Sequence, residues 1–488
     1  MLFSFRKAIF ILIGLGLQLS VAAQTTFHDA YNNFKQQVHS EYEEFRRKAN
    51  QEYAEWMRQA WEWHQLVEPV LTPKEEPVPP VVYDDKQNKS EPKPLPYDDV
   101  VPAPVPSPQP KPIAPIREDD GDYQKIQFLF YGTEGEVRLP KDQVLKLKGN
   151  DEKAYADAWE VLSSNLYDNL IRDCLVIRMK HQLCDWAYLL MLEEMSQAVC
   201  GKGTNEAVLL LSFVMCQSGY KIRLGITETN DLRLLFKSDH LIFDLTGFEM
   251  KDGLYYVLQP ISSKGLRVCD ISFPEEKPLS LWIPKEQLFE ESLASKRVLM
   301  PADSLVKITV QVNKNLIGFY QDYPTSAVSN NMMTRWAMYG NTPMSSKIKD
   351  ILYPQLREIL KGVDVLTAAN WLLYFVQTAF VYEYDDKVWG RDRAFFAEES
   401  LFYPYCDCED RSILYTRLVR DLLGLKTILV YYPGHLASAV LFNNPVKGDY
   451  ININGNRFTI CDPTYIGAPV GVTMPNMDNK TAKVILLN

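Results

Sequence analysis

Prolines divide this 488-residue chain more sharply than any other feature. Half of the thirty prolines lie between Pro69 and Pro115, many of them in alternation with valine or alanine. Proline fixes one backbone dihedral and lacks an amide donor, so such a segment favours extended polyproline II and builds no packed core. We therefore predict a semi-rigid linker over residues 68–118, which separates an N-terminal segment from the body of the chain.

The first residues have the pattern of a secretory signal peptide. Arg6 and Lys7 precede an apolar run from Ala8 to Leu19, and small residues follow at positions 21–23. The run is shorter than a membrane-spanning helix requires. We expect residues 1–23 to be a signal peptide and the exported protein to be periplasmic or secreted, with no transmembrane span. The net charge of -10 argues against a nucleic-acid partner, which would need a basic face.

Aromatic and apolar residues recur every eleven positions across residues 27–67. The rows are Phe27, Val38, Ala49 and Ala60; Tyr31, Tyr42, Tyr53 and His64; and Phe34, Phe45, Trp56 and Val67. An eleven-residue period corresponds to about 3.67 residues per turn, so the rows follow one face of a helix. We predict an amphipathic helix over residues 24–67. Its stripe either docks on an envelope partner or a second copy, or packs back on the body of the same chain.

The remaining sequence predicts two α+β blocks, at residues 119–322 and 323–488. Each block contains a polar turn, an apolar helix that ends at a glycine (Gly219 or Gly424), and a strand. When the two segments are aligned on these glycines, Gly203 takes the position of Cys408, and Asn205 takes the position of Asp410. The first block is therefore either a degenerate copy of the second, without its nucleophile, or an unrelated domain.

Cys408 is placed where a cysteine nucleophile works well. It opens a predicted helix over residues 409–423, and Gly424 is suited to a left-handed helix cap. The positive end of the helix dipole lowers a thiol pKa, and the exposed backbone donors can stabilise an oxyanion. We expect Cys408 to be an activated thiol.

A histidine and an aspartate complete a possible triad. His435 is the only histidine of the second block, and it starts a predicted strand over residues 436–442. Asp462 ends a predicted strand, where Pro463 stops the ladder. An acid at that strand end can hold the imidazole in the tautomer that a general base needs.

These three positions carry a resemblance to a known family. The run Asp-Cys-Glu-Asp-Arg-Ser at residues 407–412, the strand-initial His435 and the Asp-Pro-Thr at residues 462–464 resemble the transglutaminase-like superfamily. Residues 375–377 and 384–386 are also similar to its Asp-Cys-Glu-Asp branch, which includes bacterial transglutaminase-like cysteine proteinases. The resemblance covers residues 365–471. Cys406 stands where members usually have glycine.

The resemblance implies a papain-like α+β domain, in which a helix with the cysteine packs on an antiparallel sheet with the histidine and aspartate. It implies acyl transfer with Cys408 as nucleophile, His435 as proton shuttle and Asp462 as orienting acid. It also implies calcium at Asp407, Glu409 and Asp410, although acids at a helix N-terminus also act as caps. Gln377 is a candidate oxyanion donor or an ordinary helix glutamine.

The expected function is a cysteine peptidase or amidase, a hydrolase that acts on protein or on cell-wall peptide. A protein-crosslinking transglutaminase and a non-catalytic binding or scaffold protein are the alternatives. Two further uses of the thiols are open: a Cys406–Cys461 disulfide, and a zinc site. The zinc ligands would be Cys406, Cys408, His435 and Cys461.

Overall fold

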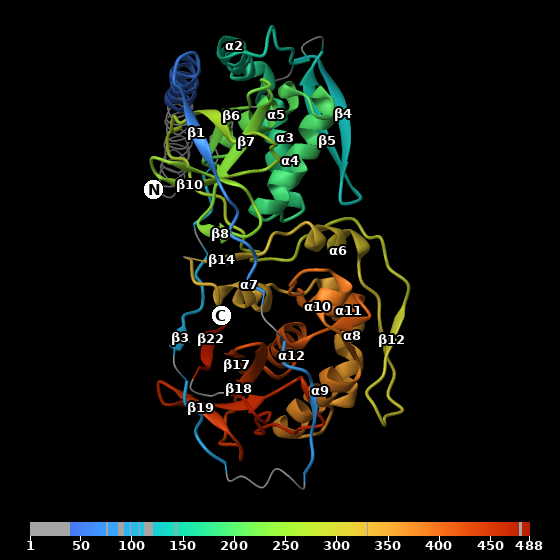
Figure 1. The fold of residues 1–488 in the computed structure, drawn as a ribbon. Coiled ribbons are helices and arrows are strands. Elements are labelled where there is room, and N and C mark those ends of the chain that lie inside the picture. The colour runs from blue at the N-terminus through green and yellow to red at the C-terminus, as the bar shows by residue number, and fades with distance from the viewer. Residues whose placement is uncertain are drawn as a thin grey trace, which may run out of the picture.

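The computed structural model describes residues 40–74, 77–85, 92–97, 99–106, 108–111, 121–141, 144–328, 330–477 and 481–488. These residues form a mixed α+β structure, as the sequence predicts, with one block above the other in Figure 1. The predicted signal peptide at residues 1–23 lies outside them. Among the helices of the described residues, none is long and apolar enough to cross a membrane.

The first block packs helices against a closed six-stranded barrel. Its predicted hairpin around Gly132 forms from β4 (Tyr123–Phe130) and β5 (Thr133–Pro140). The helices are α2 (Glu152–Leu162), α3 (Asp168–Lys180), α4 (Asp185–Cys200), α5 (Asn205–Gln217) and α6 (Lys314–Gln321), with a 3-10 turn at Asn165–Tyr167. The barrel order is β1-β11-β6-β7-β10-β9. Its strands are β1 (Trp61–Val67), β6 (Ile222–Ile226), β7 (Leu232–Lys237), β9 (Gly247–Met250), β10 (Gly253–Val257) and β11 (Gly265–Cys269).

The second block is built around a six-stranded sheet in the order β19-β20-β18-β17-β22-β3. The strands are β3 (Asp99–Val101), β17 (Lys426–Tyr432), β18 (His435–Leu441), β19 (Tyr450–Ile453), β20 (Asn456–Cys461) and β22 (Lys483–Leu486). The helices are α7 (Thr334–Asn341), α8 (Ser346–Ile359), α9 (Val365–Thr378), α10 (Asp385–Val388), α11 (Ala397–Phe402) and α12 (Cys408–Leu423). Helix α12 packs against α9 and against strands β17 and β18.

Short strand pairs join these parts. They are β2 (Val81–Val82) with β21 (Tyr465–Ile466), β8 (His240–Ile242) with β14 (Ser326–Val328), β12 (Arg297–Leu299) with β13 (Ile308–Val310), and β15 (Val381–Tyr382) with β16 (Tyr405–Cys406). The β12–β13 hairpin lies along the second block and packs on α8 (Figure 1). The predicted boundary at residues 322–323 is crossed by the β8–β14 pair and by the packing of β13 on α8.

The two sheets share one strand order. In each block, the helix α5 or α12 leads into a central antiparallel pair, β6–β7 or β17–β18. The second strand of that pair, β7 or β18, is bordered by a hairpin, β10–β9 or β20–β19. The first strand, β6 or β17, is bordered by β11 or β22. A strand from the N-terminal segment, β1 or β3, comes last in both. This shared order supports the predicted duplication, which stays a prediction.

The N-terminal helix is shorter than predicted. Residues 40–57 are helical, but residues 61–67 are strand β1, which pairs with β11 and β9. The prediction of helix up to residue 67 is wrong because backbone pairing with two barrel strands outweighs a local helical period. Tyr53 is buried with its ring 4.8 Å from that of Trp159, and Arg46 pairs with Asp168 at 2.7 Å. The rows of Ala49 and Tyr53 therefore pack on the first block, whereas Phe45, Trp56 and Val67 of the third row are exposed. Residues 24–39 lie outside the described residues.

The proline-rich segment is extended, as predicted, but its described parts are not a free spacer. Strand β2 pairs with β21 and β3 pairs with β22, both in parallel register. Pro94 bridges to Tyr450, and Leu95 is buried in the core on the outer face of the second sheet. Proline tolerates such edge positions because an edge strand needs only some of its amides. The segment thus wraps the second block.

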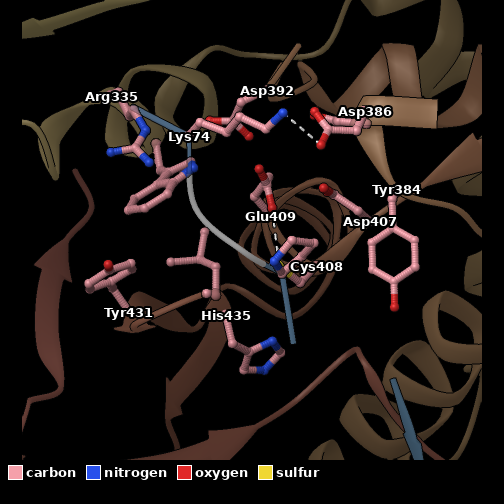
Figure 2. A pocket seen from close by; sticks show the side chains of 15 residues that line it. Lys74, Arg335, Tyr384, Asp386, Asp392, Asp407, Cys408, Glu409, Tyr431 and His435 are labelled. Atoms are coloured by element: carbon pink, nitrogen blue, oxygen red, sulfur yellow. Dashed lines mark hydrogen bonds and ion pairs between the residues drawn. The ribbon is translucent and has the colours of Figure 1, made fainter. Parts of the chain in front are cut away.

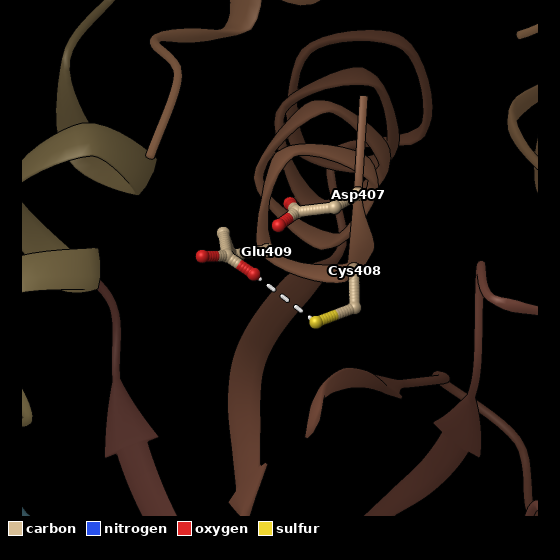
Figure 3. A group of neighbouring side chains, drawn as sticks. All are labelled: Asp407, Cys408 and Glu409. Carbon is tan, nitrogen blue, oxygen red and sulfur yellow. Dashed lines mark hydrogen bonds between the residues drawn. The ribbon is translucent and has the colours of Figure 1, made fainter. Parts of the chain in front are cut away.

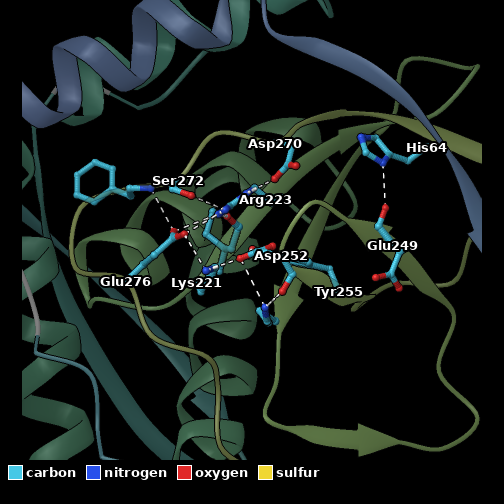
Figure 4. Close-up of polar contacts among 12 residues, drawn as sticks. His64, Lys221, Arg223, Glu249, Asp252, Tyr255, Asp270, Ser272 and Glu276 are labelled. Atoms are coloured by element: carbon cyan, nitrogen blue, oxygen red, sulfur yellow. Dashed lines mark hydrogen bonds and ion pairs between the residues drawn. The ribbon is translucent and has the colours of Figure 1, made fainter.

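A buried charge network joins the strands of the barrel (Figure 4). Arg223 of β6 is 1% exposed and bonds to Asp270 and Glu276, each at 3.0 Å. Lys221 pairs with Asp252 beside it. A buried arginine is tolerated only when its donors are paired, so this network requires one register of the strands around it.

We predict that Tyr53→Ala lowers the free energy of unfolding by about 3 kcal/mol, because it leaves a cavity beside Trp159 and Phe273. Trp56→Ala is the matched control in the same helix: its ring is 51% exposed, and we expect a change within about 0.5 kcal/mol. Denaturant unfolding of both variants measures the difference. Equal effects would contradict the docking of this helix on the first block.

Candidate functional site

Cys408 is the first residue of α12 and lies at a buried helix end. Its side chain is 4% exposed. The Asp410 carboxylate accepts from the backbone amides of Asp407 and Phe395, which ties the start of α12 to the preceding loop. Gly424 ends the helix in the left-handed conformation, at φ 67°, as the sequence predicts.

His435 and Asp462 meet as predicted. His435 begins β18, Asp462 directly follows the neighbouring antiparallel strand β20, and Nε2 lies 2.9 Å from the Asp462 Oδ2. Both residues are 2% exposed. The Asp462 Oδ1 accepts from the amides of Thr464 and Tyr465, so the carboxylate is held from both sides. Nδ1 of His435 has no hydrogen-bond partner among the described residues.

The thiol and the imidazole lie at one cavity but are not hydrogen bonded. The Cys408 Sγ donates instead to Glu409 Oε2 at 3.1 Å (Figure 3). Burial raises the pKa of Cys408 well above its usual range, and the carboxylates of Glu409 and Asp407 raise it further. The expectation that the helix N-terminus lowers this pKa is therefore wrong for the structure as it stands. Burial and adjacent negative charge outweigh the helix dipole.

Five carboxyl groups surround the start of α12. Those of Asp385, Asp407, Glu409 and Asp410 are buried, and that of Asp392 is partly buried. They form two clusters that share Asp385: one with Asp392 and Glu409, and one with Asp407 and Asp410. Within each cluster the carboxylate oxygens lie within 4.8 Å of one another. Burial and the charge of Glu409 raise the pKa of Asp385 to about 8, and burial with Glu409 and Asp410 raises that of Asp407 well above its ordinary value. The crowding is electrostatically unfavourable without a compensating cation.

The cluster fits a hard divalent cation. Carboxylate oxygens are the ligands that calcium prefers, and Asp407 Oδ1 is buried without a hydrogen-bond partner. Asp407, Glu409 and Asp410 are the predicted ligands, and the structure adds Asp385 and Asp392. The sequence contained Asp385 in the segment that resembles the family, but nothing local indicated that a loop would bring Asp392 to it.

The other uses predicted for the thiols are not seen. All eight cysteines are free, so the Cys406–Cys461 disulfide is wrong for this structure. Cys408 is the one thiol in any candidate metal cluster of the described residues, and it lies with carboxylates, so the zinc site is also wrong. The strands that carry Cys406 and Cys461 belong to different sheets.

Gln377 holds the loop that follows Asp462, and its amide is not placed as an oxyanion donor. Its Nε2 donates to the carbonyls of Asp462, Tyr465 and Ala468 at 2.8–3.0 Å, and its Oε1 accepts from Gly467. All of its polar atoms are used in holding the loop after Asp462. The plainer expectation, a satisfied helix glutamine, is correct.

The side chains of the site line a small, partly open pocket of about 50 Å³. Figure 2 shows how they lie around it. Cys408 and His435 line it together with the carboxylates and with Arg335, Trp336 and Tyr431. Two residues of the proline-rich segment, Lys74 and Pro77, complete the lining. The sequence analysis did not foresee any part of that segment at the site.

The first block lacks counterparts of Cys408, His435 and Asp462. We aligned the two blocks on the glycine that ends each helix, Gly219 or Gly424, and then followed the residues that pair between neighbouring strands. In this alignment Gly203, Asp231 and Gln259 take the places of Cys408, His435 and Asp462. None of the three is a nucleophile or a neutral base of the required kind. Comparison with known proteins adds no further guide: no protein-family model, curated protein or solved structure matches this chain.

We predict that stability without calcium falls as the pH rises from about 4 to about 8. The pKa of Asp385 is raised from 3.8 to about 8 on folding, so the folded protein holds this proton more tightly and loses relative stability as the proton leaves. The charged groups around Asp385 are the carboxyl groups of Asp392, Asp407, Glu409 and Asp410 and the guanidinium of Arg393. Thermal unfolding in chelator should show a fall of several degrees, which calcium reverses most strongly at pH 8.

Asp385→Asn should flatten this pH dependence. Asp386→Asn is its matched control, because that neighbouring carboxylate is half exposed. A melting temperature that is equal with chelator and with calcium at pH 8 would contradict a cation site here.

Proposed function

We propose that this protein is a cysteine peptidase or amidase with a papain-like, transglutaminase-like catalytic block, in which Cys408, His435 and Asp462 form the triad. The observation that carries the proposal is the buried 2.9 Å contact between His435 Nε2 and Asp462, at the helix end where Cys408 lies. That contact assigns the proton of the neutral imidazole to Nε2, so Nδ1 has a lone pair to take a thiol proton.

The reaction follows from these atoms. His435 Nδ1 takes the proton of Cys408, and the sulfur attacks the carbonyl carbon of an amide. The tetrahedral intermediate collapses with loss of the amine, which takes the proton from His435, and leaves a thioester on Cys408. Water then attacks the thioester with His435 as base, and the carboxylic acid and the free thiol are restored. Backbone amides at the start of α12 are the donors for the oxyanion.

Calcium is the cation that we propose for the carboxylate cluster, with ligands from Asp407, Glu409, Asp410, Asp385 and Asp392. When bound, it supplies positive charge that offsets the carboxylates around the thiol. Bound there, calcium would engage Glu409, which is the present hydrogen-bond partner of the Cys408 thiol.

The alternatives differ in what accepts the acyl group. A transglutaminase would transfer it to an amine, but no described feature of the site specifies an amine. The first block, with Gly203, Asp231 and Gln259 at the triad positions, supports a binding role for that block alone. We propose that the protein is exported, by its signal peptide, and acts on protein or cell-wall peptide outside the cytoplasm.

We predict that, with calcium present, iodoacetamide modifies Cys408 rapidly near pH 7 and that His435→Ala slows this at least tenfold, because the thiolate loses its imidazolium partner. Mapping of modified peptides by mass spectrometry gives the rate for each thiol. His240→Ala is the matched control, since His240 is a buried histidine of the first block.

Cys408→Ser should abolish amide hydrolysis, whereas Cys406→Ser, two positions earlier, should retain it. Uniformly slow labelling of all thiols, unchanged in His435→Ala, would overturn the enzymatic proposal in favour of a binding protein. Incorporation of a fluorescent primary amine into protein would identify a transglutaminase instead.

A further inference from the structure

One stretch of the proline-rich segment lies directly over the proposed catalytic site. We call residues 70–74 and 77–83 the strap. At one end the strap is fixed to the first block, where Thr72 bonds through its amide and its hydroxyl to the Asp244 carboxylate, and the Asp244 amide donates to the Val70 carbonyl. At the other end β2 pairs with β21, just beyond Asp462.

Between these ends the strap contacts residues on both sides of the triad. Lys74 Nζ lies 2.8 Å from Asp386 on α10, beside the carboxylate cluster (Figure 2). The Val78 amide donates to the carbonyl of Gly434, the residue immediately before His435, at 2.8 Å. Tyr83 packs edge-to-face on Tyr465, with ring centroids 5.5 Å apart. The strap therefore runs past the acidic side, the histidine and the aspartate loop in turn.

The geometry of the strap is that of a bound peptide. It is extended, it makes backbone hydrogen bonds at Gly434 and along β21, and it places one charged side chain against a carboxylate. Strand addition to a short exposed strand is a common way for proteins to bind extended peptides. Among the described residues, β21 has no strand partner other than β2.

The cavity that remains beneath the strap is too small for a substrate. Its volume of about 50 Å³ would hold a few water molecules, whereas sites for ligands of modest size measure roughly 300–1,000 Å³. Cys408 and His435 are also both nearly inaccessible. Lys74 and Pro77 of the strap line this pocket, so departure of the strap would widen the approach to the thiol.

Resting on the function proposed above, we propose that the strap occupies the substrate cleft, and that the substrate is an extended polypeptide with a basic side chain that replaces Lys74 against Asp386. The charge of the cleft agrees with this class of substrate. Asp386 has a side chain that is 50% exposed, and among the described carboxylates that line the pocket it is the one that the proposed calcium site does not use.

The test uses the full chain with calcium present and measures modification of Cys408 by a bulky maleimide–polyethylene glycol and by iodoacetamide. Lys74→Ala combined with Val78→Pro removes the ion pair and the amide donor of the strap. We expect the bulky reagent to modify Cys408 roughly tenfold faster in this double variant than in the wild type, as the loss of one exposed ion pair and one hydrogen bond implies. Lys93→Ala, an exposed lysine of the same proline-rich segment outside the cleft, is the control and should label at the wild-type rate.

Peptides added to the double variant test the substrate class. A peptide with the sequence of residues 70–85 should protect Cys408, and the same peptide with Lys74→Gln should protect about two- to fivefold less well. This preference should disappear when Asp386→Asn is added. Each single variant is measured as well, so that a folding defect in one does not decide the result.

A bulky-reagent rate that is unchanged in both single variants and the double variant would overturn the strap proposal. Equal protection by the two peptides would overturn the basic side chain. The function proposed above is judged separately, by the dependence of iodoacetamide labelling on His435. If the bulky-reagent rate does not change but iodoacetamide labelling still depends on His435, the strap proposal is refuted and the proposed catalytic function is not.

Discussion

Repulsion among buried carboxylates at the start of α12 is the interaction on which the proposed site depends. Asp407, Glu409 and Asp410 follow one another around Cys408, and Asp385 is added from α10. Their charge, together with burial, outweighs the helix dipole and keeps the thiol protonated and bonded to Glu409. A cation bound among these groups would offset their negative charge around the Cys408 thiol.

The fold explains how the histidine and the aspartate reach that helix end. In the second sheet the central pair β17–β18 starts from the end of α12, so His435 returns to the start of the helix after one hairpin. The neighbouring strand β20 runs antiparallel to β18, so Asp462, which follows β20, lies at the same end of the sheet as His435. The first block repeats this strand order but has Gly203, Asp231 and Gln259 at the positions of Cys408, His435 and Asp462. The strand order alone therefore does not determine which side chains stand at these positions.

Local signals predicted much of the site. The left-handed cap at Gly424, the strand that begins at His435 and the acid before Pro463 each follow from a few neighbouring residues, and the pairing of strands brings them together. Long-range pairing was not predictable in this way. Residues 61–67 continue a helical period yet form a barrel strand, because their partners in β11 and β9 lie 180–208 positions further along the chain and leave no mark on the local pattern. The strap and Asp392 were missed for the same reason.

The contribution of one N-terminal stretch to both sheets has a consequence for how the protein is made. Strands β1 and β3 leave the ribosome long before the strands that pair with them, and Pro104 finally contacts Asn488, 384 positions later. Contacts of such high sequence separation form slowly and leave strand edges open to aggregation in the meantime. The prolines of this stretch limit such wrong pairing. Proline lacks an amide donor, so a proline-rich chain pairs poorly with other strands before its own partner strand has been made.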